Sequence, residues 1–120
     1  MPEPMTLDHY QEMATRTAIY PGRGTVLGLT YVALKLNGEA GEVAEHLGKA
    51  LRDDGLGSSV DGLTAERRAA IIREGGDVLW YLAALCEELG IGLGEMAAHN
   101  IAKLRSRSAR GTLQGEGDDR

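Results

Sequence analysis

Apolar and polar positions along the chain repeat with the period of an α-helix, and no segment sustains the alternation of a half-buried strand. The pattern predicts four helices, over about residues 7–18, 29–51, 64–89 and 93–107. Thr6 and Thr64 stand at the start of the first and third helices, and threonine is a favoured N-cap residue. The sequence therefore predicts an all-α fold.

The length of the chain, 120 residues, fits one domain. We expect a single helical domain over residues 1–110 and a polar tail over residues 111–120. The connection at 53–62 is rich in glycine and serine and is long for a helix connection in a compact bundle. A chain of this size buries roughly 65–70% of its unfolded surface, so oligomer formation would help it to form a sufficient core.

Composition excludes several classes of protein. The net charge of −5 disfavours nucleic acid as the main partner, because that binding depends on clustered Lys and Arg. The longest apolar run, Val78 to Cys86, is much shorter than the about 20 residues of a membrane span. The start of the chain lacks the features of a secretory signal, and Cys86 is the single cysteine, so we expect a cytoplasmic protein.

Carboxylates border the apolar stripes of the second and third predicted helices. Glu39 and Glu42 are three residues apart on the second helix, and Glu74 and Asp77 have the same spacing on the third. Antiparallel packing of the two helices would bring all four carboxylates together at the edge of the shared core. One such pair is common on a solvated helix face, but two pairs beside apolar stripes indicate a site for Mg²⁺ or Mn²⁺.

Two further polar side chains, Lys35 and His46, share the carboxylate stripe of the second helix. Lys35 is a candidate for binding an anionic substrate. His46 is a candidate for contacting a carboxylate that binds the metal, without binding the metal itself. Glycines interrupt both helices at a cost of about 1 kcal/mol each relative to alanine. Close helix approach or room for a ligand would explain these glycines, which are Gly38, Gly41, Gly75 and Gly76.

Two segments at these residues resemble a known family. Residues 34–45 read LKLNGEAGEVAE and residues 74–82 read EGGDVLWYL. They resemble the Glu-x-x-Glu and Glu-x-x-Asp helices of the MazG-like nucleoside triphosphate pyrophosphohydrolases, in the all-α NTP pyrophosphatase superfamily. The resemblance extends from about residue 29 to residue 107 and includes a motif on the last helix that lies on the phosphate side in the family: Asn100, Lys103 and Arg107.

The resemblance implies a four-helix bundle, completed by oligomerisation, that hydrolyses a nucleoside triphosphate to a monophosphate and pyrophosphate. It implies metal ligands at Glu39, Glu42, Glu74 and Asp77, with Mg²⁺ or Mn²⁺ as cofactor and Glu39 as the general base. Binding of the substrate would involve Lys35, Trp80, Tyr81, Asn100, Lys103 and Arg107. Trp80 and Tyr81 would stack on the base, although aromatic residues in mid-helix also commonly pack in a core or a subunit interface.

Two departures from the family pattern concern the rim of this site. Many relatives carry an acidic pair where Gly38 and Glu39 stand here, so Gly38 replaces its first member. The stretch between Glu42 and Glu74 is also longer than usual because of the 53–62 connection. We expect this insertion to change the lid or rim of the site and not its chemistry.

Two alternatives remain open. A phosphoribosyl-ATP pyrophosphohydrolase of histidine biosynthesis would share the carboxylates, and a non-catalytic helical oligomer serving as an interaction module would carry them as solvated surface. Apolar residues outside the core stripes, namely Leu34, Leu79 and Trp80, favour self-association, and we expect a homodimer or homotetramer. Neither nucleic acid nor a membrane is an expected partner.

Overall fold

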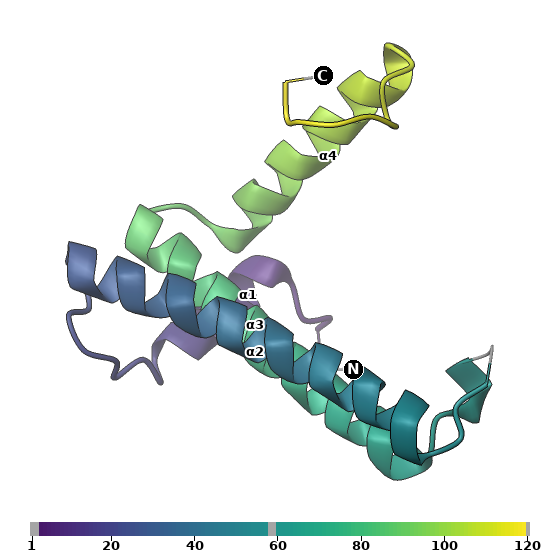
Figure 1. Ribbon diagram of the computed structural model, residues 1–120. Helices are drawn as coiled ribbons and strands as arrows, with labels where there is room; N and C mark the ends of the chain where they lie inside the picture. The colour runs from purple at the N-terminus through teal and green to yellow at the C-terminus, as the bar shows by residue number, and fades with distance from the viewer. Residues whose placement is uncertain (1–2, 58–59, 120) are drawn as a thin grey trace.

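The computed structural model describes residues 3–57 and 60–119, and in these ranges it has four α-helices and no strand (Figure 1). The helices are α1 (Leu7–Thr15), α2 (Val26–Asp53), α3 (Ala65–Leu89) and α4 (Leu93–Ala109), with a short 3-10 helix η1 (Val60–Gly62) before α3. The predicted all-α fold is confirmed. Within the described residues, no helix is long and apolar enough to cross a membrane.

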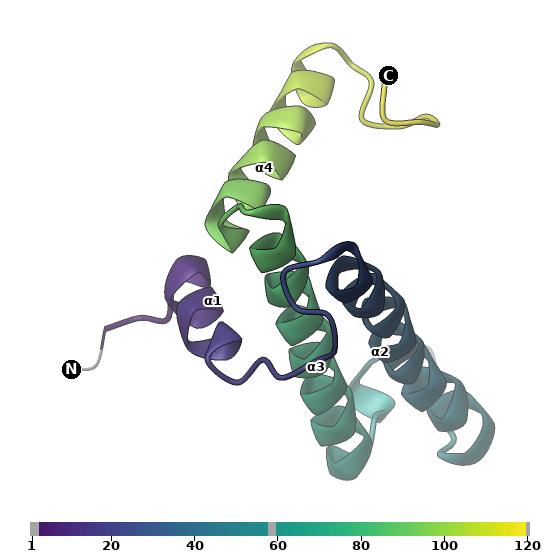
Figure 2. The ribbon, with the colours of Figure 1, turned by 90° about the vertical axis from the view of Figure 1, so that its left-hand side faces the viewer.

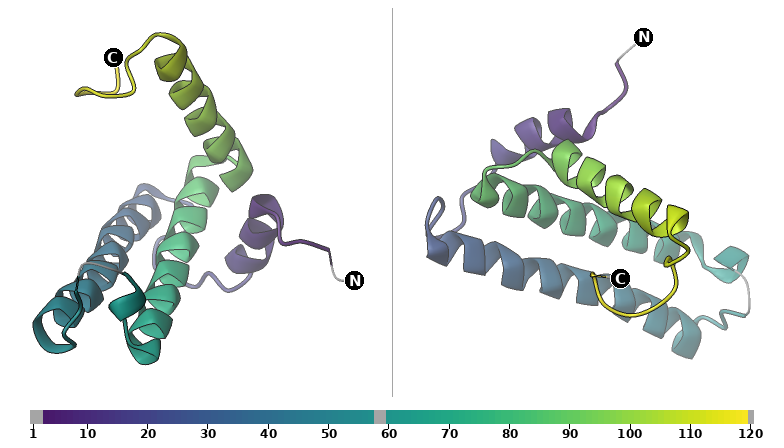
Figure 3. Two further views of the ribbon diagram at one scale, coloured as in Figure 1. Left: turned by 90° about the vertical axis from the view of Figure 1, so that its right-hand side faces the viewer. Right: turned by 90° about the horizontal axis from the view of Figure 1, so that it is seen from above.

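Helices α2 and α3 form an antiparallel hairpin that makes up most of the packing (Figures 1 and 3). Helix α1 lies against the side of α3 that faces away from α2 (Figure 2). Helix α4 contacts α1 and α3 near its start and then projects away from the hairpin, and none of its described residues contacts α2. One copy of the chain therefore does not close a compact bundle around α4.

Threonines begin the first three helices. Thr6 Oγ1 accepts a hydrogen bond of 3.1 Å from the backbone N–H of His9, and Thr64 Oγ1 accepts one of 3.0 Å from Arg67, so both predicted N-caps are confirmed. Thr25 caps α2, which consequently starts at Val26, three residues earlier than expected. The first helix ends at residue 15, earlier than the predicted residue 18, because the chain turns there toward the 20–24 loop.

The turn between α3 and α4 is held by side chains of α1. Gln11 is buried, donates to the Ile91 carbonyl at 3.0 Å and accepts from the Leu93 N–H at 2.7 Å. Asp8 Oδ1 accepts from the Gly94 N–H at 2.9 Å, so both side chains satisfy free amides in the first turn of α4. These contacts fix the direction in which α4 leaves the hairpin.

Small residues form the core, at the junction of α1, α3 and α4. Ala83, Cys86 and Leu93 are its buried centre, with partly buried apolar side chains around them. Helical spacing places Val32, Leu47 and Leu51 on one apolar stripe of α2; Val32 is buried, but Leu47 and Leu51 near the end of α2 are exposed. In a single copy this stripe is therefore core only in part, because the only helix that packs along α2 in the described residues is α3.

The predicted long connection between the second and third helices is present. It includes η1 and is closed on one side by a contact between Asp54 at the end of α2 and Arg67 in the first turn of α3. Ser58 and Ser59, in the middle of the predicted 53–62 segment, lie outside the described residues.

Candidate functional site

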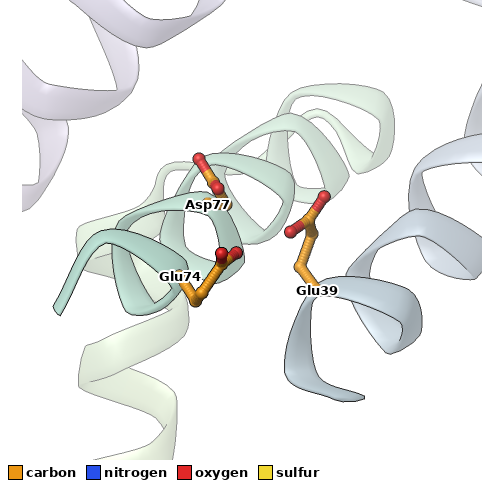
Figure 4. Close-up of side chains that lie close together, drawn as sticks. All are labelled: Glu39, Glu74 and Asp77. Carbon is orange, nitrogen blue, oxygen red and sulfur yellow. The ribbon is translucent and has the colours of Figure 1, made fainter. Parts of the chain in front are cut away.

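Three carboxylates meet between the two helices of the hairpin. Glu39 projects from α2 toward Glu74 and Asp77 on α3 (Figure 4). One oxygen from each carboxylate lies within 4.8 Å of the others. The i,i+3 spacing places Glu74 and Asp77 on the same face of α3, and the antiparallel packing brings that face opposite Glu39. The structure thus brings together three of the four predicted metal ligands.

The donor set of this cluster fits a hard divalent cation. Oxygens that share a Mg²⁺ lie at most about 4 Å apart, because each Mg–O bond is about 2.1 Å long. Small side-chain rotations would bring the three oxygens from their observed separations to that distance. Burial raises the pKa of Glu39, and the facing carboxylates of Asp77 and Glu74 raise it further. A cation bound between them would remove this repulsion.

Two other predicted residues of α2, Glu42 and Lys35, lie beside the cluster. Both side chains are exposed, and Glu42 is outside the group of three. Burial and the two facing carboxylates have the largest effects on the pKa of Glu39. Lys35 lowers this pKa and Glu42 raises it, so both charges act on the site.

Aromatic side chains form one wall of a pocket next to the carboxylates. Glu39, Asp77, Trp80 and Tyr81 line this pocket of about 340 Å³. Trp80 and Tyr81 meet edge to face, with ring centroids 4.9 Å apart, and burial raises the pKa of the Tyr81 hydroxyl. Both predicted aromatic residues therefore lie next to the carboxylate cluster.

Sequence reasoning missed two aromatic residues, Tyr20 and Tyr31, which extend this group of rings but do not line the pocket. Their rings stack with centroids 6.0 Å apart, and Tyr20 also meets Trp80 edge to face at 6.4 Å. Tyr31 stands four residues before Lys35 on α2, a spacing that would have placed it on the carboxylate stripe. Tyr20 lies in the loop between α1 and α2, where helical periodicity gives no signal.

The predicted residues of the last helix do not reach the carboxylates of their own chain. Asn100, Lys103 and Arg107 lie on α4, which projects away from the hairpin (Figure 1). Arg107 is buried and donates to the backbone carbonyl of Asp118 at 2.7 Å, and Lys103 lies 3.5 Å from an Asp118 carboxylate oxygen. In a single copy, the C-terminal tail contacts both cations.

Four glycines of the two motifs border open space. A Cβ atom added to Gly38, Gly41, Gly75 or Gly76 would meet no atom of another described segment within 4 Å, so helix packing inside one copy does not require them. Of the two explanations offered by the sequence, close helix approach within one chain is excluded. Room for a ligand or for another subunit remains for Gly38, Gly41, Gly75 and Gly76.

Comparison with known proteins identifies the family of this chain. The family model of the MazG nucleotide pyrophosphohydrolase domain matches residues 29–111, which include α3, α4 and all of α2 except its first three residues. The "Gene 37 protein" of Mycobacterium phage L5 is 45% identical over 120 aligned residues, which cover 97% of this chain and 100% of the relative. No solved structure matches significantly. The matched domain contains the carboxylate cluster, its aromatic wall and the cations of α4, and the chain therefore belongs to the MazG nucleotide pyrophosphohydrolase family.

Proposed function

We propose that this protein is a metal-dependent nucleoside triphosphate pyrophosphohydrolase that converts an NTP or dNTP to the monophosphate and pyrophosphate. The observation that carries the proposal is the convergence of Glu39, Glu74 and Asp77 beside an aromatic-walled pocket, inside the region that matches the family. Metal ligands and an apolar wall are what a nucleotide requires, because its phosphates are anionic and its base is flat and aromatic. In the cell, the cytoplasm is the proposed location.

The proposed reaction is attack of water on the α-phosphorus. The water oxygen forms a bond to this phosphorus, and the bond from the α-phosphorus to the bridging oxygen breaks. The bonding electrons leave with pyrophosphate, and the proton of the water passes to a carboxylate. Glu39, Glu74 and Asp77 would hold Mg²⁺ or Mn²⁺, with Glu42 as the proposed fourth ligand. The bound ion would neutralise the charge of the phosphates and activate the water.

Glu39 is the proposed proton acceptor. Burial is the first cause of its raised pKa and does not depend on the facing carboxylates, and a carboxylate with a raised pKa is a stronger base. It also lines the pocket together with the aromatic residues, so its oxygens face the space that a substrate would occupy. Lys35, on the same helix, is the proposed cation that contacts the phosphates at this end.

Trp80 and Tyr81 are the proposed contacts for the nucleobase. Trp80 is held by a hydrogen bond of 3.0 Å from its Nε1 to Thr17 Oγ1, and by the edge of Tyr20. A fixed ring loses little conformational freedom when a base stacks on it. The aromatic wall thus supports binding of a nucleotide at the side of the pocket that lies away from the metal ligands.

Residues of α4 are proposed to bind the leaving pyrophosphate in an oligomer. Arg107 Nε is buried without a hydrogen-bond partner in the described part of the chain, and the guanidinium contacts Asp118 of the tail, so this donor would reach a ligand only after that contact opens. Asn100, Lys103 and Arg107 follow one face of α4, but α4 makes no contact with α2 among the described residues. We propose that they complete the carboxylate site of another subunit.

Exposed apolar side chains support this self-association. Ile19 is 95% exposed, and Leu34 and Leu51 on α2 are 68% and 64% exposed. Large apolar residues spread over several helix faces are typical of chains that pack against copies of themselves. A homodimer or a homotetramer would bury them, and nothing in the charge or surface favours nucleic acid or a membrane as a partner.

A pyrophosphate-release assay tests the proposal. The protein is incubated with Mg²⁺ and each common ribonucleoside and deoxyribonucleoside triphosphate, and with phosphoribosyl-ATP, in the presence of inorganic pyrophosphatase. We expect phosphate release that requires both Mg²⁺ and the pyrophosphatase and that is lost in Glu39→Gln. Turnover of phosphoribosyl-ATP alone would assign the protein to histidine biosynthesis, and no turnover of any substrate would favour a non-catalytic module.

A further inference from the structure

A chain of four polar side chains runs from the carboxylate cluster to the end of the hairpin. His46 Nε2 on α2 lies 3.6 Å from Glu74 Oε1 on α3, and His46 Nδ1 lies 3.2 Å from Arg67 Nη1. Arg67 Nε in turn donates to Asp54 Oδ2 at 2.9 Å. All four side chains are only 19% to 23% exposed, so solvent screens their interactions less than those of the other ion pairs on the surface.

The order of donors and acceptors in this chain is fixed by Arg67. A guanidinium has only N–H donors, so His46 Nδ1 must accept the hydrogen bond and carry no proton. The imidazole proton then lies on Nε2, the nitrogen that faces Glu74. The donation from Arg67 also polarises the ring and makes this N–H a better donor.

Arg67 is itself held in place at both ends. Its backbone N–H donates to Thr64 at the start of α3, and its guanidinium bridges Asp54, the C-cap residue of α2, to His46. The ring of His46 therefore has one orientation. The gap of 3.6 Å to Glu74 exceeds a hydrogen bond, and a small rotation of the Glu74 carboxylate would close it.

We propose that His46 is a positioning residue that holds Glu74 in the orientation that binds a divalent cation, with Arg67 and Asp54 fixing its ring. This inference rests on the proposed function, in which Glu74 is a metal ligand. One Glu74 oxygen faces His46, which leaves the other oxygen for the cation. Removal of such an outer contact typically weakens metal binding by about 10-fold to 100-fold.

Manganese binding to the full-length protein tests this role without any turnover. The dissociation constant for Mn²⁺ is measured by electron paramagnetic resonance for the wild type, His46→Leu, His46→Gln and His46→Asn. A glutamine amide can occupy the place of Nε2 and still donate to Glu74, whereas leucine donates nothing and an asparagine amide reaches only the place of Nδ1. We expect binding about 10-fold weaker in the leucine and asparagine variants, and near wild type in the glutamine variant.

His99→Gln is the matched control. His99 Nε2 lies 3.7 Å from Glu95 on α4, a contact of the same kind that is exposed and outside the carboxylate cluster. The His99→Gln substitution should leave the dissociation constant for Mn²⁺ unchanged. Equal binding by the wild type, His46→Leu and His46→Asn would overturn the positioning role, whereas absence of Mn²⁺ binding by the wild type would overturn the proposed function on which it rests.

A second measurement needs no metal. Nitrogen-15 NMR of the metal-free wild type reports which ring nitrogen of His46 carries the proton. We expect a pyrrole-like Nε2 and a pyridine-like Nδ1, and Arg67→Lys should weaken this preference because lysine cannot bridge both partners. If a thermal scan shows that His46→Leu is unfolded, the positioning role is tested by the tautomer of His46 in the wild type and by Mn²⁺ binding of His46→Gln compared with His46→Asn. A proton on Nδ1 would contradict the proposal.

Discussion

The carboxylates of Glu39 and Asp77 face each other across the α2/α3 hairpin, and Glu74 joins them with one oxygen of each within 4.8 Å of the others (Figure 4). Carboxylates this close repel one another, and the raised pKa of Glu39, caused by burial and then by these two neighbours, is a consequence. The hairpin therefore carries a cost in stability that a bound cation would remove.

Neutralising one of these carboxylates should stabilise the metal-free protein. Because the pKa of Glu39 is raised in the fold, its contribution to stability is present below the ordinary carboxylate pKa and is lost as the pH rises through the raised pKa. In EDTA, Glu39→Gln should therefore raise the melting temperature, and the gain should grow as the pH increases through this acidic range.

Glu45→Gln is the control for this effect. Glu45 lies on the exposed face of α2 and pairs with Lys49 at 2.9 Å, a contact that lowers its pKa. Its replacement should give no stabilisation at neutral pH. A lower melting temperature for Glu39→Gln than for the wild type in EDTA would show that the cluster is not under charge repulsion.

Divalent cations should stabilise the protein by mass action. At a hundredfold excess of Mg²⁺ over its dissociation constant, the free energy of unfolding should rise by about 2.7 kcal/mol. Differential scanning calorimetry with and without Mg²⁺ measures this, and Asp77→Asn should reduce the rise. An equal rise in the wild type and the variant would place the bound cation somewhere else.

Helical spacing together with antiparallel packing of the two helices predicted three members of the carboxylate cluster. Glu74 and Asp77 share a face because they are three residues apart in one helix, and Glu39 faces them because the two helices pair antiparallel. The spacing can be read from the sequence, whereas the antiparallel pairing was an assumption, and Glu42 lies outside the group of three. The same reasoning placed His46 beside the cluster, where the structure has it.

Long-range contacts explain what the sequence did not show. Tyr20 packs edge to face with Trp80 from a loop, which is a tertiary contact. The direction of α4 depends on hydrogen bonds that the N–H groups of its first turn donate to the side chains of Gln11 and Asp8, and no periodicity encodes them. Lys103 and Arg107 were predicted on the correct helix, but their distance from the carboxylates could not be derived from spacing.

Hydrogen bonds between the 20–24 loop and Glu88 on α3 should make the free energy of unfolding depend on pH in the acidic range. Glu88 accepts hydrogen bonds from the Tyr20 hydroxyl and from the Gly24 N–H at 3.0 Å, and these bonds, that of Tyr20 first, lower its pKa. The stabilisation is present above the ordinary carboxylate pKa and is lost as the pH falls through the lowered one. Burial and this bond raise the pKa of Tyr20 to about 12.

Glu88→Gln should therefore destabilise the protein by about 1–2 kcal/mol at neutral pH, with a smaller difference in acid. Urea unfolding at several pH values measures this. Glu12→Gln, which breaks an exposed pair with Arg16, is the matched control and should cost at most about 0.5 kcal/mol. Equal effects of the two substitutions would mean that the hydrogen bonds of Glu88 contribute no more to the free energy of unfolding than an ordinary surface contact.

Self-association should be visible both in mass and in activity. We expect a solution mass at least twice the 12.8 kDa of one chain by light scattering, and Leu34→Asp should reduce it. Asp77→Asn and Lys103→Ala should each be inactive alone. Mixed and refolded together, they should regain part of the activity, because a hybrid oligomer contains one intact site. A monomer that hydrolyses nucleotide would contradict this arrangement.

The position of the oxygen derived from water tests the central claim most directly. The protein is incubated with Mg²⁺ and a nucleoside triphosphate substrate in water enriched in oxygen-18, and the products are analysed by phosphorus NMR. The account predicts the label in the nucleoside monophosphate, unlabelled pyrophosphate as the other product, and no reaction with Asp77→Asn. Label in pyrophosphate, release of a nucleoside diphosphate, or full activity of Asp77→Asn would contradict it.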